Sequence, residues 1–402
     1  MSWWFVSNNV RSDQDRSAQL SQSNGDIASA RRAAAHSRHA SRVLLLTFAE
    51  RGLEDGGEPG EDSRMALDAP PPVKTRVFTA IDYTKEGKQT GILRVPQVRD
   101  DSGWGVIQIP ICVIRNGAGP TLLLTGCTHG DEYEAPLAMM DLARELEPKD
   151  LKGRVIIIPA LHFPAAKAGR RTSPVDGKDL NRSFPGRAEG TFAEIIAHYV
   201  TEVLMPITDA NIDLHSGGLG MDFVPSTTSH VLDNKAKQEE TERLGMAFGA
   251  PYHVVIHEVD ASYTFMSTCE RKGVTAISSE LGGIARVSIP GVECAAKGLR
   301  NALIHYGMMK GKVPDSPTRR VVVPNHDAYC FAPEGGVYRP FHALGATIEK
   351  GQPVGAIYSF DQPFRDPIVL KMGAEGELWS TRGPGYVSAG DPVAVVVKEA
   401  KG

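Results

Sequence analysis

Short apolar runs alternate with helical patterns along the middle of this chain, from about residue 73 to residue 315. The apolar runs predict strands over 106–114, 121–126, 154–160, 210–215, 252–257 and 274–280. The helical patterns fill 133–146, 191–204, 235–248, 262–271 and 291–308. Such an alternation is typical of an α/β domain with a largely parallel, buried sheet. We therefore expect one α/β domain over 73–315.

The two ends of the chain depart from this pattern. Residues 1–72 are polar, rich in Ser, Ala and Arg, and close on a Pro-Pro-Pro run. This composition predicts a mostly disordered extension. After about residue 315 the helical periodicity stops, and β segments punctuated by glycine continue to the end, which predicts a small all-β domain over 316–402.

Two similar motifs occur in this C-terminal region. Gly351-Gln-Pro-Val354 follows Ala-Thr-Ile-Glu-Lys, and Gly390-Asp-Pro-Val393 follows Gly-Tyr-Val-Ser-Ala. The likeness predicts a duplicated hairpin in a compact barrel or sandwich. The region resembles lipoyl-like folds in outline, but no convincing lysine for a prosthetic group stands at a hairpin tip, so we expect a structural cap.

Composition and charge exclude several classes of protein. With 402 residues, 41% hydrophobic content and a formal charge of −4, the chain can build one large or two ordinary domains. Forty-four basic against forty-eight acidic residues give no electrostatic case for a nucleic-acid partner, and no apolar run is long enough for a membrane span. The five cysteines are odd in number and scattered, which fits reduced thiols in a cytoplasm.

The candidate chemistry starts at His129 and Glu132, which place an imidazole and a carboxylate three positions apart where an apolar run ends. Catalytic zinc takes three protein ligands from His, Glu, Asp or Cys and leaves a further position open. His215 ends the strand-like run Ala210-Asn-Ile-Asp-Leu-His215 and is the candidate third ligand, because ligand sites form at the carboxyl ends of strands in α/β sheets. A lone His-x-x-Glu is common by chance, so the pair could equally be an exposed polar turn. Cys127, two residues before His129, is expected to be a small buried filler.

Two acidic residues near these positions are candidates for supporting roles. Glu280 ends a third predicted strand, where burial would disfavour a charge, so it is a candidate general acid and base. An exposed strand-end glutamate is the alternative. Asp213 shares a strand face with His215 and could orient that imidazole or make a structural hydrogen bond.

The loop predicted over 162–190 is longer than a connection needs and is therefore a functional candidate. Asn181 and Arg182 offer an amide and a planar guanidinium suited to a substrate carboxylate. Arg171 could polarise a carbonyl and stabilise the oxyanion formed on attack. Surface arginines that pair with acids are the alternative.

The motifs Gly-x-x-His-Gly-Asp-Glu, Asp-Leu-Asn-Arg-x-Phe-Pro-Gly, Asp-Leu-His and Glu-Leu-Gly follow one another in this order. In this the chain resembles the succinylglutamate desuccinylase/aspartoacylase family of zinc amidohydrolases, relatives of zinc carboxypeptidases. The resemblance implies a zinc-carboxypeptidase-like mixed sheet flanked by helices, with the C-terminal β domain capping the site. It also implies one Zn²⁺ per chain and a set of roles: ligands His129, Glu132 and His215, acid and base Glu280, Arg171 at the carbonyl, and Asn181 with Arg182 at a carboxylate.

Within that family, the stretches around Trp104, His129 and Arg171 are similar to the N-acetyl-L-2,4-diaminobutyrate deacetylases of ectoine breakdown. Ten positions before Glu280, where aspartoacylase carries an arginine that contacts substrate, this chain has Glu270. A carboxylate there would suit a cationic side chain such as the free amine of diaminobutyrate.

These inferences predict a cytoplasmic zinc-dependent hydrolase that cleaves an N-acyl amino acid, with homo-oligomerisation as an option. An aspartoacylase-type or desuccinylase-type activity on another N-acyl amino acid is one rival. A metallocarboxypeptidase is another, although the 83 positions from Glu132 to His215 are fewer than resemblance to that branch implies. A catalytically silent protein that keeps the fold is the rival from a different class.

Overall fold

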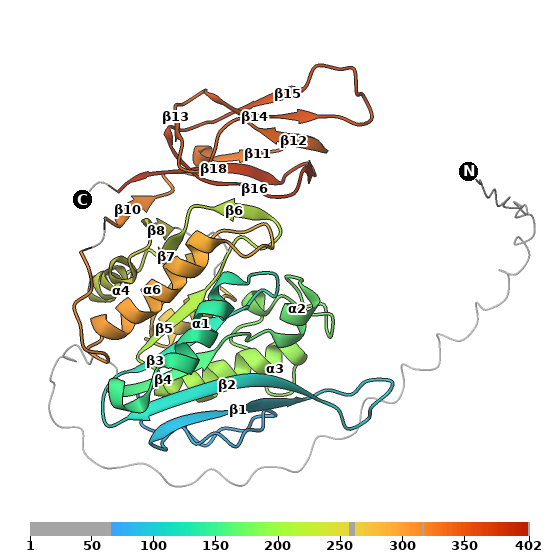
Figure 1. Ribbon diagram of the computed structural model, residues 1–402. Helices are drawn as coiled ribbons and strands as arrows, with labels where there is room; N and C mark the ends of the chain where they lie inside the picture. Colours follow the sequence, from blue (N-terminus) through green and yellow to red (C-terminus); the bar gives the residue numbers. More distant parts are fainter. Residues whose placement is uncertain (1–65, 257–261, 316, 401–402) are drawn as a thin grey trace, which may run out of the picture. The chain divides into compact units, whose positions relative to one another are not determined.

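A fourteen-stranded mixed sheet runs through the part of the chain that the computed structural model describes, residues 66–256, 262–315 and 317–400 (Figure 1). Its strands in chain order are β1 (Gly87–Pro96), β2 (Val106–Asn116), β3 (Thr121–Gly126), β4 (Gly153–Ile158), β5 (Ala210–Leu214), β6 (Met221–Phe223), β7 (Ser226–His230), β8 (Tyr252–Ile256), β9 (Thr275–Glu280), β10 (Arg319–Val322), β11 (Tyr329–Phe331), β13 (Thr347–Ile348), β16 (Gly376–Arg382) and β18 (Pro392–Glu399). The main path is β1-β2-β4-β3-β5-β9-β7-β8-β10-β18-β16-β13. All six predicted strands are present.

The centre of the sheet is parallel, as predicted, and an antiparallel pair joins it on each side. Strands β4, β3, β5 and β9 pair in parallel, whereas β2 joins β4 and β7 joins β9 in antiparallel fashion. Every residue of β3 and β4 is buried, which is what a parallel strand covered on both faces requires.

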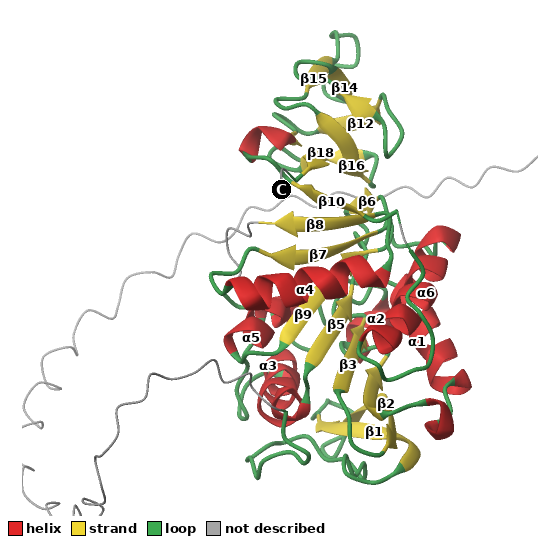
Figure 2. Ribbon diagram, turned by 90° about the vertical axis from the view of Figure 1, so that its left-hand side faces the viewer, coloured by secondary structure: helices red, strands yellow, loops and turns green. Residues whose placement is uncertain are grey.

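Helices cover both faces of this central region (Figure 2). They are α1 (Glu134–Glu145), α2 (Phe163–Ala168), α3 (Phe192–Tyr199), α4 (Lys235–Phe248), α5 (Phe265–Arg271) and α6 (Ile289–His305). Because side chains alternate along a strand, Leu122 and Leu124 of β3 pack in one core with α1, α4 and α6, and Leu123 packs in the other with α3 and α5. The predicted α/β architecture is confirmed.

Two predictions, one of a helix and one of a loop, need correction. The helix expected over 191–204 leaves α geometry after Tyr199 and continues as a wider π turn over Val200–Leu204. Pro206 follows and has no N–H for a helical hydrogen bond, which accounts for the early end. The loop expected over 162–190 contains α2 and a short 3-10 turn, Leu180–Arg182, so it is less irregular than predicted.

After α6, the described residues of the C-terminal region contain strands and one 3-10 turn but no α-helix, as expected. A second, four-stranded sheet is formed by β12 (Gly336–Pro340), β14 (Pro353–Tyr358), β15 (Ile368–Lys371) and β17 (Tyr386–Val387). β10 pairs in parallel with β8 and antiparallel with β18, so main-chain hydrogen bonding continues from the α/β region into the C-terminal region.

The duplicated motifs form equivalent turns but not hairpins. Gly351 and Gly390 both have positive φ, and each leads into a strand, β14 or β18. The strands before and after each turn belong to different sheets: β13 pairs with β16 while β14 pairs with β12, and β17 pairs with β12 while β18 pairs with β16. The prediction of hairpins was therefore wrong, because each motif crosses from one sheet to the other.

Residues 1–65, most of the predicted extension, lie outside the described residues. Residues 66–72 form no helix or strand. They nevertheless contact the α/β region: the Leu67 N–H donates to the Pro206 carbonyl at 2.9 Å, and the buried Arg154 guanidinium donates to the Asp68 carbonyl at 2.7 Å.

Candidate metal centre and active site

The predicted ligands come together where β3, β5 and β9 end side by side. β3 and β5 pair in parallel with Gly126 opposite Leu214, and β5 and β9 pair with Asp213 opposite Ser278. His129 and Glu132 lie in the loop that follows β3, His215 follows β5, and Glu280 is the last residue of β9. Three parallel strands thus deliver the four side chains to one edge of the sheet.

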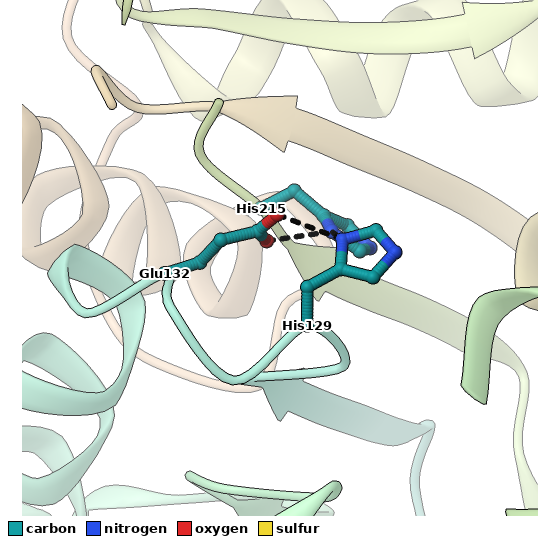
Figure 3. Close-up of side chains that lie close together, drawn as sticks. All are labelled: His129, Glu132 and His215. Atoms are coloured by element: carbon teal, nitrogen blue, oxygen red, sulfur yellow. Dashed lines mark hydrogen bonds and ion pairs between the residues drawn. The ribbon is translucent and has the colours of Figure 1, made fainter. Parts of the chain in front are cut away.

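The side chains of His129, Glu132 and His215 point toward one another (Figure 3). Glu132 Oε1 lies 2.7 Å from His129 Nδ1, and Glu132 Oε2 lies 2.8 Å from His215 Nδ1. One donor atom from each residue lies within 4.8 Å of the other two, and all three side chains are buried. Burial opposes ionisation of Glu132, but His129 and His215 lower the pKa of this carboxyl to about 2.

The donor set fits a zinc ion. Two imidazole nitrogens, His129 Nδ1 and His215 Nδ1, lie only 3.1 Å apart and face the same carboxylate. Nitrogen lone pairs directed at each other are unfavourable unless a proton or a cation lies between them. Two histidines and one glutamate form a known ligand set of catalytic zinc.

Asp213 orients His215, which was one of its two predicted roles. Its Oδ2 atom lies 2.8 Å from His215 Nε2, so the ring donates to the carboxylate there and directs Nδ1 to the centre. Its Oδ1 atom accepts hydrogen bonds from the Thr125 and Thr128 hydroxyls at 2.7 and 2.8 Å. Although burial opposes the charged ring, Asp213 and Glu132 together raise the pKa of His215 well above its usual value.

Hydrogen bonds lock the loop after β3 to the loop after β5. Asp131 Oδ2 accepts from the Leu219 N–H at 2.7 Å, and the Ser216 hydroxyl donates to Glu134 Oε2 at 2.7 Å. Both acidic residues are buried. These bonds fix Glu132 relative to His215 before any ligand arrives.

Asp179 is a residue of the site to which the sequence analysis gave no role. Its Oδ1 atom lies 3.3 Å from His129 Nε2, and its Oδ2 atom accepts from Arg171 Nε at 2.9 Å. Burial opposes its ionisation, but the hydrogen bond to His129 and the charges of His129 and Arg171 lower the pKa of Asp179. The available signal was its position at the start of the Asp-Leu-Asn-Arg run.

Three of the predicted site residues, Arg171, Asn181 and Arg182, line the same cavity. Arg171 Nη1 lies 3.5 Å from His129 Nδ1, which places the guanidinium at the rim of the centre. The amide oxygen of Asn181 accepts from the Phe265 N–H at 2.9 Å, so its NH₂ group is the part that can donate to a ligand. Arg182 Nη1 donates to the Asn181 carbonyl at 3.0 Å.

Glu280 is a half-buried residue of the cavity wall, and its Oε2 atom is buried. Within the described part of the chain, its Oε2 atom has no hydrogen-bond partner. Burial raises the pKa of Glu280 to about 8, and the nearby Glu132 charge acts in the same direction. A backbone hydrogen bond holds Glu280 close to His215: the N–H of the following residue, Leu281, donates to the His215 carbonyl at 3.0 Å. A carboxyl beside the candidate centre that has a buried oxygen without a partner is suited to proton transfer.

The cavity has a volume of about 390 Å³ and takes its walls from distant parts of the chain. Phe223 and Tyr329 contribute aromatic surface, and Thr228 and Ser278 contribute hydroxyl groups. The sequence analysis predicted none of these four. Tyr329 belongs to the C-terminal region, whose role as a cap over the site stays a prediction.

Two further residues lie beside the cavity rather than in it. Glu270 contacts His230, with Glu270 Oε1 3.0 Å from His230 Nδ1, and it is not among the residues that line the cavity. Its contact with a substrate amine stays a prediction. The Cys127 thiol is buried and donates to the Glu132 carbonyl at 3.0 Å, and burial raises its pKa, which agrees with a filler.

Sequence comparison relates the chain to known proteins. Residues 118–306 match the succinylglutamate desuccinylase/aspartoacylase catalytic domain. Over 324 residues the chain is 39% identical to the N-alpha-acetyl-L-2,4-diaminobutyric acid deacetylase of Halomonas elongata, covering 80% of this chain and 95% of that relative.

Solved structures show the same likeness. A succinylglutamate desuccinylase/aspartoacylase from Rhodobacter sphaeroides is 40% identical, with a TM-score of 0.79 and coverage of 82% of this chain and 100% of that one. The product-bound ectoine utilization protein EutE (DoeB) from Ruegeria pomeroyi is also 40% identical, with a TM-score of 0.79 and coverage of 81% and 99%. Among the helices of the described residues, none is both long enough and apolar enough to cross a membrane.

Proposed function

Because this chain belongs to the succinylglutamate desuccinylase/aspartoacylase family, we propose that it is a zinc-dependent deacylase of N-acyl amino acids, with Nα-acetyl-L-2,4-diaminobutyrate as its substrate. The products would be acetate and diaminobutyrate. One observation carries the proposed chemistry: the mutually facing donors of His129, Glu132 and His215 line the same cavity as Glu280, whose buried Oε2 atom has no hydrogen-bond partner in the described part of the chain. The relatives named for diaminobutyrate deacetylation and ectoine utilization support the substrate.

His129, Glu132 and His215 would hold the zinc ion, each through one donor atom. When zinc binds at such a site, it activates a water molecule and polarises a carbonyl group. Asp213 and Asp179 would keep the two imidazole rings in orientation, because each contacts the ring nitrogen that faces away from the centre.

Glu280 would carry the proton between reactants. It accepts a proton from the attacking water and then donates it to the nitrogen of the departing amine. Its raised pKa suits this cycle, since a carboxylate with an ordinary pKa is a weak base toward water and holds almost no proton near neutral pH. Arg171, at the rim of the centre, would donate to the oxygen that becomes negative during attack.

The cavity limits what the enzyme can accept. Its volume suits a single small amino-acid derivative, and Tyr329 from the C-terminal region closes one side. Asn181 and Arg182 would bind the substrate carboxylate through the amide NH₂ and the guanidinium. These features favour an N-acyl amino acid over the long peptide chain that a carboxypeptidase must accommodate.

A substrate panel tests the proposal. The purified protein is analysed for bound metal and then assayed on Nα-acetyl-diaminobutyrate, N-acetylaspartate, N-succinylglutamate and a hippuryl peptide. We expect about one zinc per chain and the highest kcat/KM on the first compound. Preference for the hippuryl peptide, or full activity in protein free of transition metals, would overturn the proposal.

A further inference from the structure

Glu134, the first residue of α1, is a buried carboxyl to which the proposed mechanism assigns no step. It follows Glu132 by two positions, and it lies behind the cavity wall rather than in it. Burial of a carboxyl opposes folding unless hydrogen bonds compensate for the lost hydration. Both oxygens of Glu134 accept such hydrogen bonds, and each oxygen contacts a different segment of the chain.

One oxygen connects Glu134 to the candidate metal ligands. Ser216 directly follows His215, and the Ser216 hydroxyl donates to Glu134 Oε2 at 2.7 Å. The N–H of the same serine donates to Glu132 Oε2 at 3.3 Å. This Glu132 oxygen is also the atom that lies 2.8 Å from His215 Nδ1. A fixed Ser216 therefore holds the carboxylate of one candidate ligand beside the ring of another.

The other oxygen connects Glu134 to the segment that follows the candidate acid and base. Glu134 Oε1 accepts from the Ser288 N–H at 3.2 Å. Ser288 is the N-cap of α6, and its hydroxyl donates to the Leu281 carbonyl at 3.2 Å. Leu281 directly follows Glu280. A second path of two hydrogen bonds thus leads from Glu134, through Ser288, to the backbone next to Glu280.

Close packing leaves Glu134 and its partners little freedom to shift. A Cβ on Gly291 would lie 2.0 Å from the Leu281 carbonyl oxygen and 2.8 Å from Glu134 Cγ. A Cβ on Gly282 would lie 2.9 Å from the Ser288 hydroxyl oxygen. Both distances are shorter than van der Waals contact, so glycine is required at each position. The start of α6 and the segment after β9 therefore pack directly against the Glu134 carboxyl.

We propose that Glu134 is a positioning residue that sets the place of Glu280 relative to the zinc ligands, an inference that rests on the proposed function. The three segments that it joins follow β3, β5 and β9, and they carry the candidate ligands Glu132 and His215 and the acid and base. Glu134 is not itself a candidate ligand and does not line the cavity, so it acts through its two serine partners. A displacement of about 1 Å in a reacting group can lower a rate about 100-fold, so this spacing matters for turnover.

The first test measures the zinc dissociation constant of the full-length protein by competition with a chelator of known affinity. Glu134→Ala should raise this constant about 10- to 100-fold, because Ser216 loses its acceptor. Glu134→Gln should stay within about threefold of the wild type, since the amide oxygen can accept from the Ser288 N–H while the NH₂ group donates to the Ser216 hydroxyl. Glu145→Ala is the matched control, because Glu145 ends the same helix, is exposed and contacts Arg300.

The second test separates the two paths. Ser216→Ala should raise the zinc dissociation constant, and adding it to Glu134→Ala should raise that constant no further, because both changes remove the same link. Ser288→Ala should lower kcat about tenfold while the zinc dissociation constant and KM stay unchanged, since Ser288 does not line the cavity. Asn234→Ala, which removes the exposed N-cap of α4, controls for the loss of a helix cap and should leave kcat unchanged.

Four results would overturn the proposal: wild-type zinc affinity in Glu134→Ala, equal losses in Glu134→Ala and Glu134→Gln, zinc losses that multiply in the double variant, or wild-type kcat in Ser288→Ala. Circular dichroism and thermal melting check that each variant is folded at the assay temperature. Zinc affinity is measured without substrate. A wild type that binds zinc but hydrolyses no N-acyl amino acid would therefore contradict the proposed function, while the zinc affinities would still decide the role of Glu134.

Discussion

Asp213 contacts His215 at Nε2, at 2.8 Å, and the opposite nitrogen of the same ring, Nδ1, lies 2.8 Å from Glu132. One carboxylate thus fixes the tautomer of the imidazole, and a second faces the ring nitrogen on the other side. The two hydroxyl groups that donate to Asp213 hold its carboxyl group in position. The geometry of the candidate metal centre therefore depends on residues that are not themselves candidate ligands.

Asp213→Asn should weaken zinc binding about 10- to 100-fold, because the amide has no negative charge to favour the required tautomer. Competition with a chelator of known affinity measures the zinc dissociation constant. Asp141→Asn is the matched control, since Asp141 lies on the exposed side of α1 and contacts Arg144. Equal zinc affinity in Asp213→Asn and wild type would show that Asp213 has only a structural role.

Glu280→Gln should lower kcat about 10²- to 10⁴-fold while zinc stays bound, because glutamine keeps the shape of the side chain but cannot accept a proton. Metal analysis and steady-state kinetics on the same preparation separate the two effects. Glu375→Gln, at an exposed position in the C-terminal region, should behave as the wild type. A kcat within tenfold of the wild-type value would remove Glu280 from the proton-transfer step.

Arg171→Ala should lower kcat about 10²- to 10³-fold, the loss expected when one donor to a developing oxyanion is removed. Zinc should remain bound, since Arg171 is not a ligand. Arg170→Ala is the matched control, because Arg170 carries the same charge and lies next to Arg171 in the sequence. This variant should change kcat little. Similar losses in both variants would point to general electrostatics rather than a specific contact.

His253 should make the folded state less stable in mild acid. It is buried between the Thr227 and Ser229 hydroxyls, at 2.9 and 3.1 Å, and burial lowers its pKa to about 4. Between the unfolded pKa near 6.5 and the folded pKa near 4, only the unfolded chain takes up a proton at this position. The free energy of unfolding should therefore fall by about 2 kcal/mol from pH 7 to pH 5 through this residue.

Urea unfolding of wild type and His253→Gln at both pH values measures this contribution. Glutamine can hydrogen-bond to the same hydroxyls but does not titrate. The variant should lose about 2 kcal/mol less than the wild type over this pH range, whatever its stability at pH 7. Parallel losses in the two proteins would show that His253 does not couple to pH.

The strands and the clustering of His129, Glu132 and His215 were predictable, because the strands are apolar runs and the three residues come shortly after two of these runs. Parallel pairing of β3, β5 and β9 then brings the ends of these runs together. The strand β7, Ser-Thr-Thr-Ser-His, was missed because it contains no apolar residue. It is buried all the same, since its hydroxyls bond to His253 and to the Trp379 indole N–H.

Side-chain direction and strand partners could not be read from the sequence. Asp179 lies in a loop, where no periodicity tells which way a carboxylate points, so its contact with His129 was not foreseen. The predicted substrate contact of Glu270 depends only on its position ten residues before Glu280. Such a spacing in the sequence does not tell whether a side chain lines the cavity. The repeated Gly-x-Pro-Val motifs predicted two equivalent turns, but not that each turn would change sheets.

Strand β10 lies between β8 and β18, so residue 315 is not a boundary at which the chain can be divided without breaking the sheet. A protein shortened there would leave β8 with an uncovered backbone edge, the kind of surface through which sheets aggregate. It would also lose Tyr329 from the cavity. The C-terminal region therefore supplies both a covering strand for the sheet and part of the cavity wall, while the candidate metal ligands all come from the α/β region.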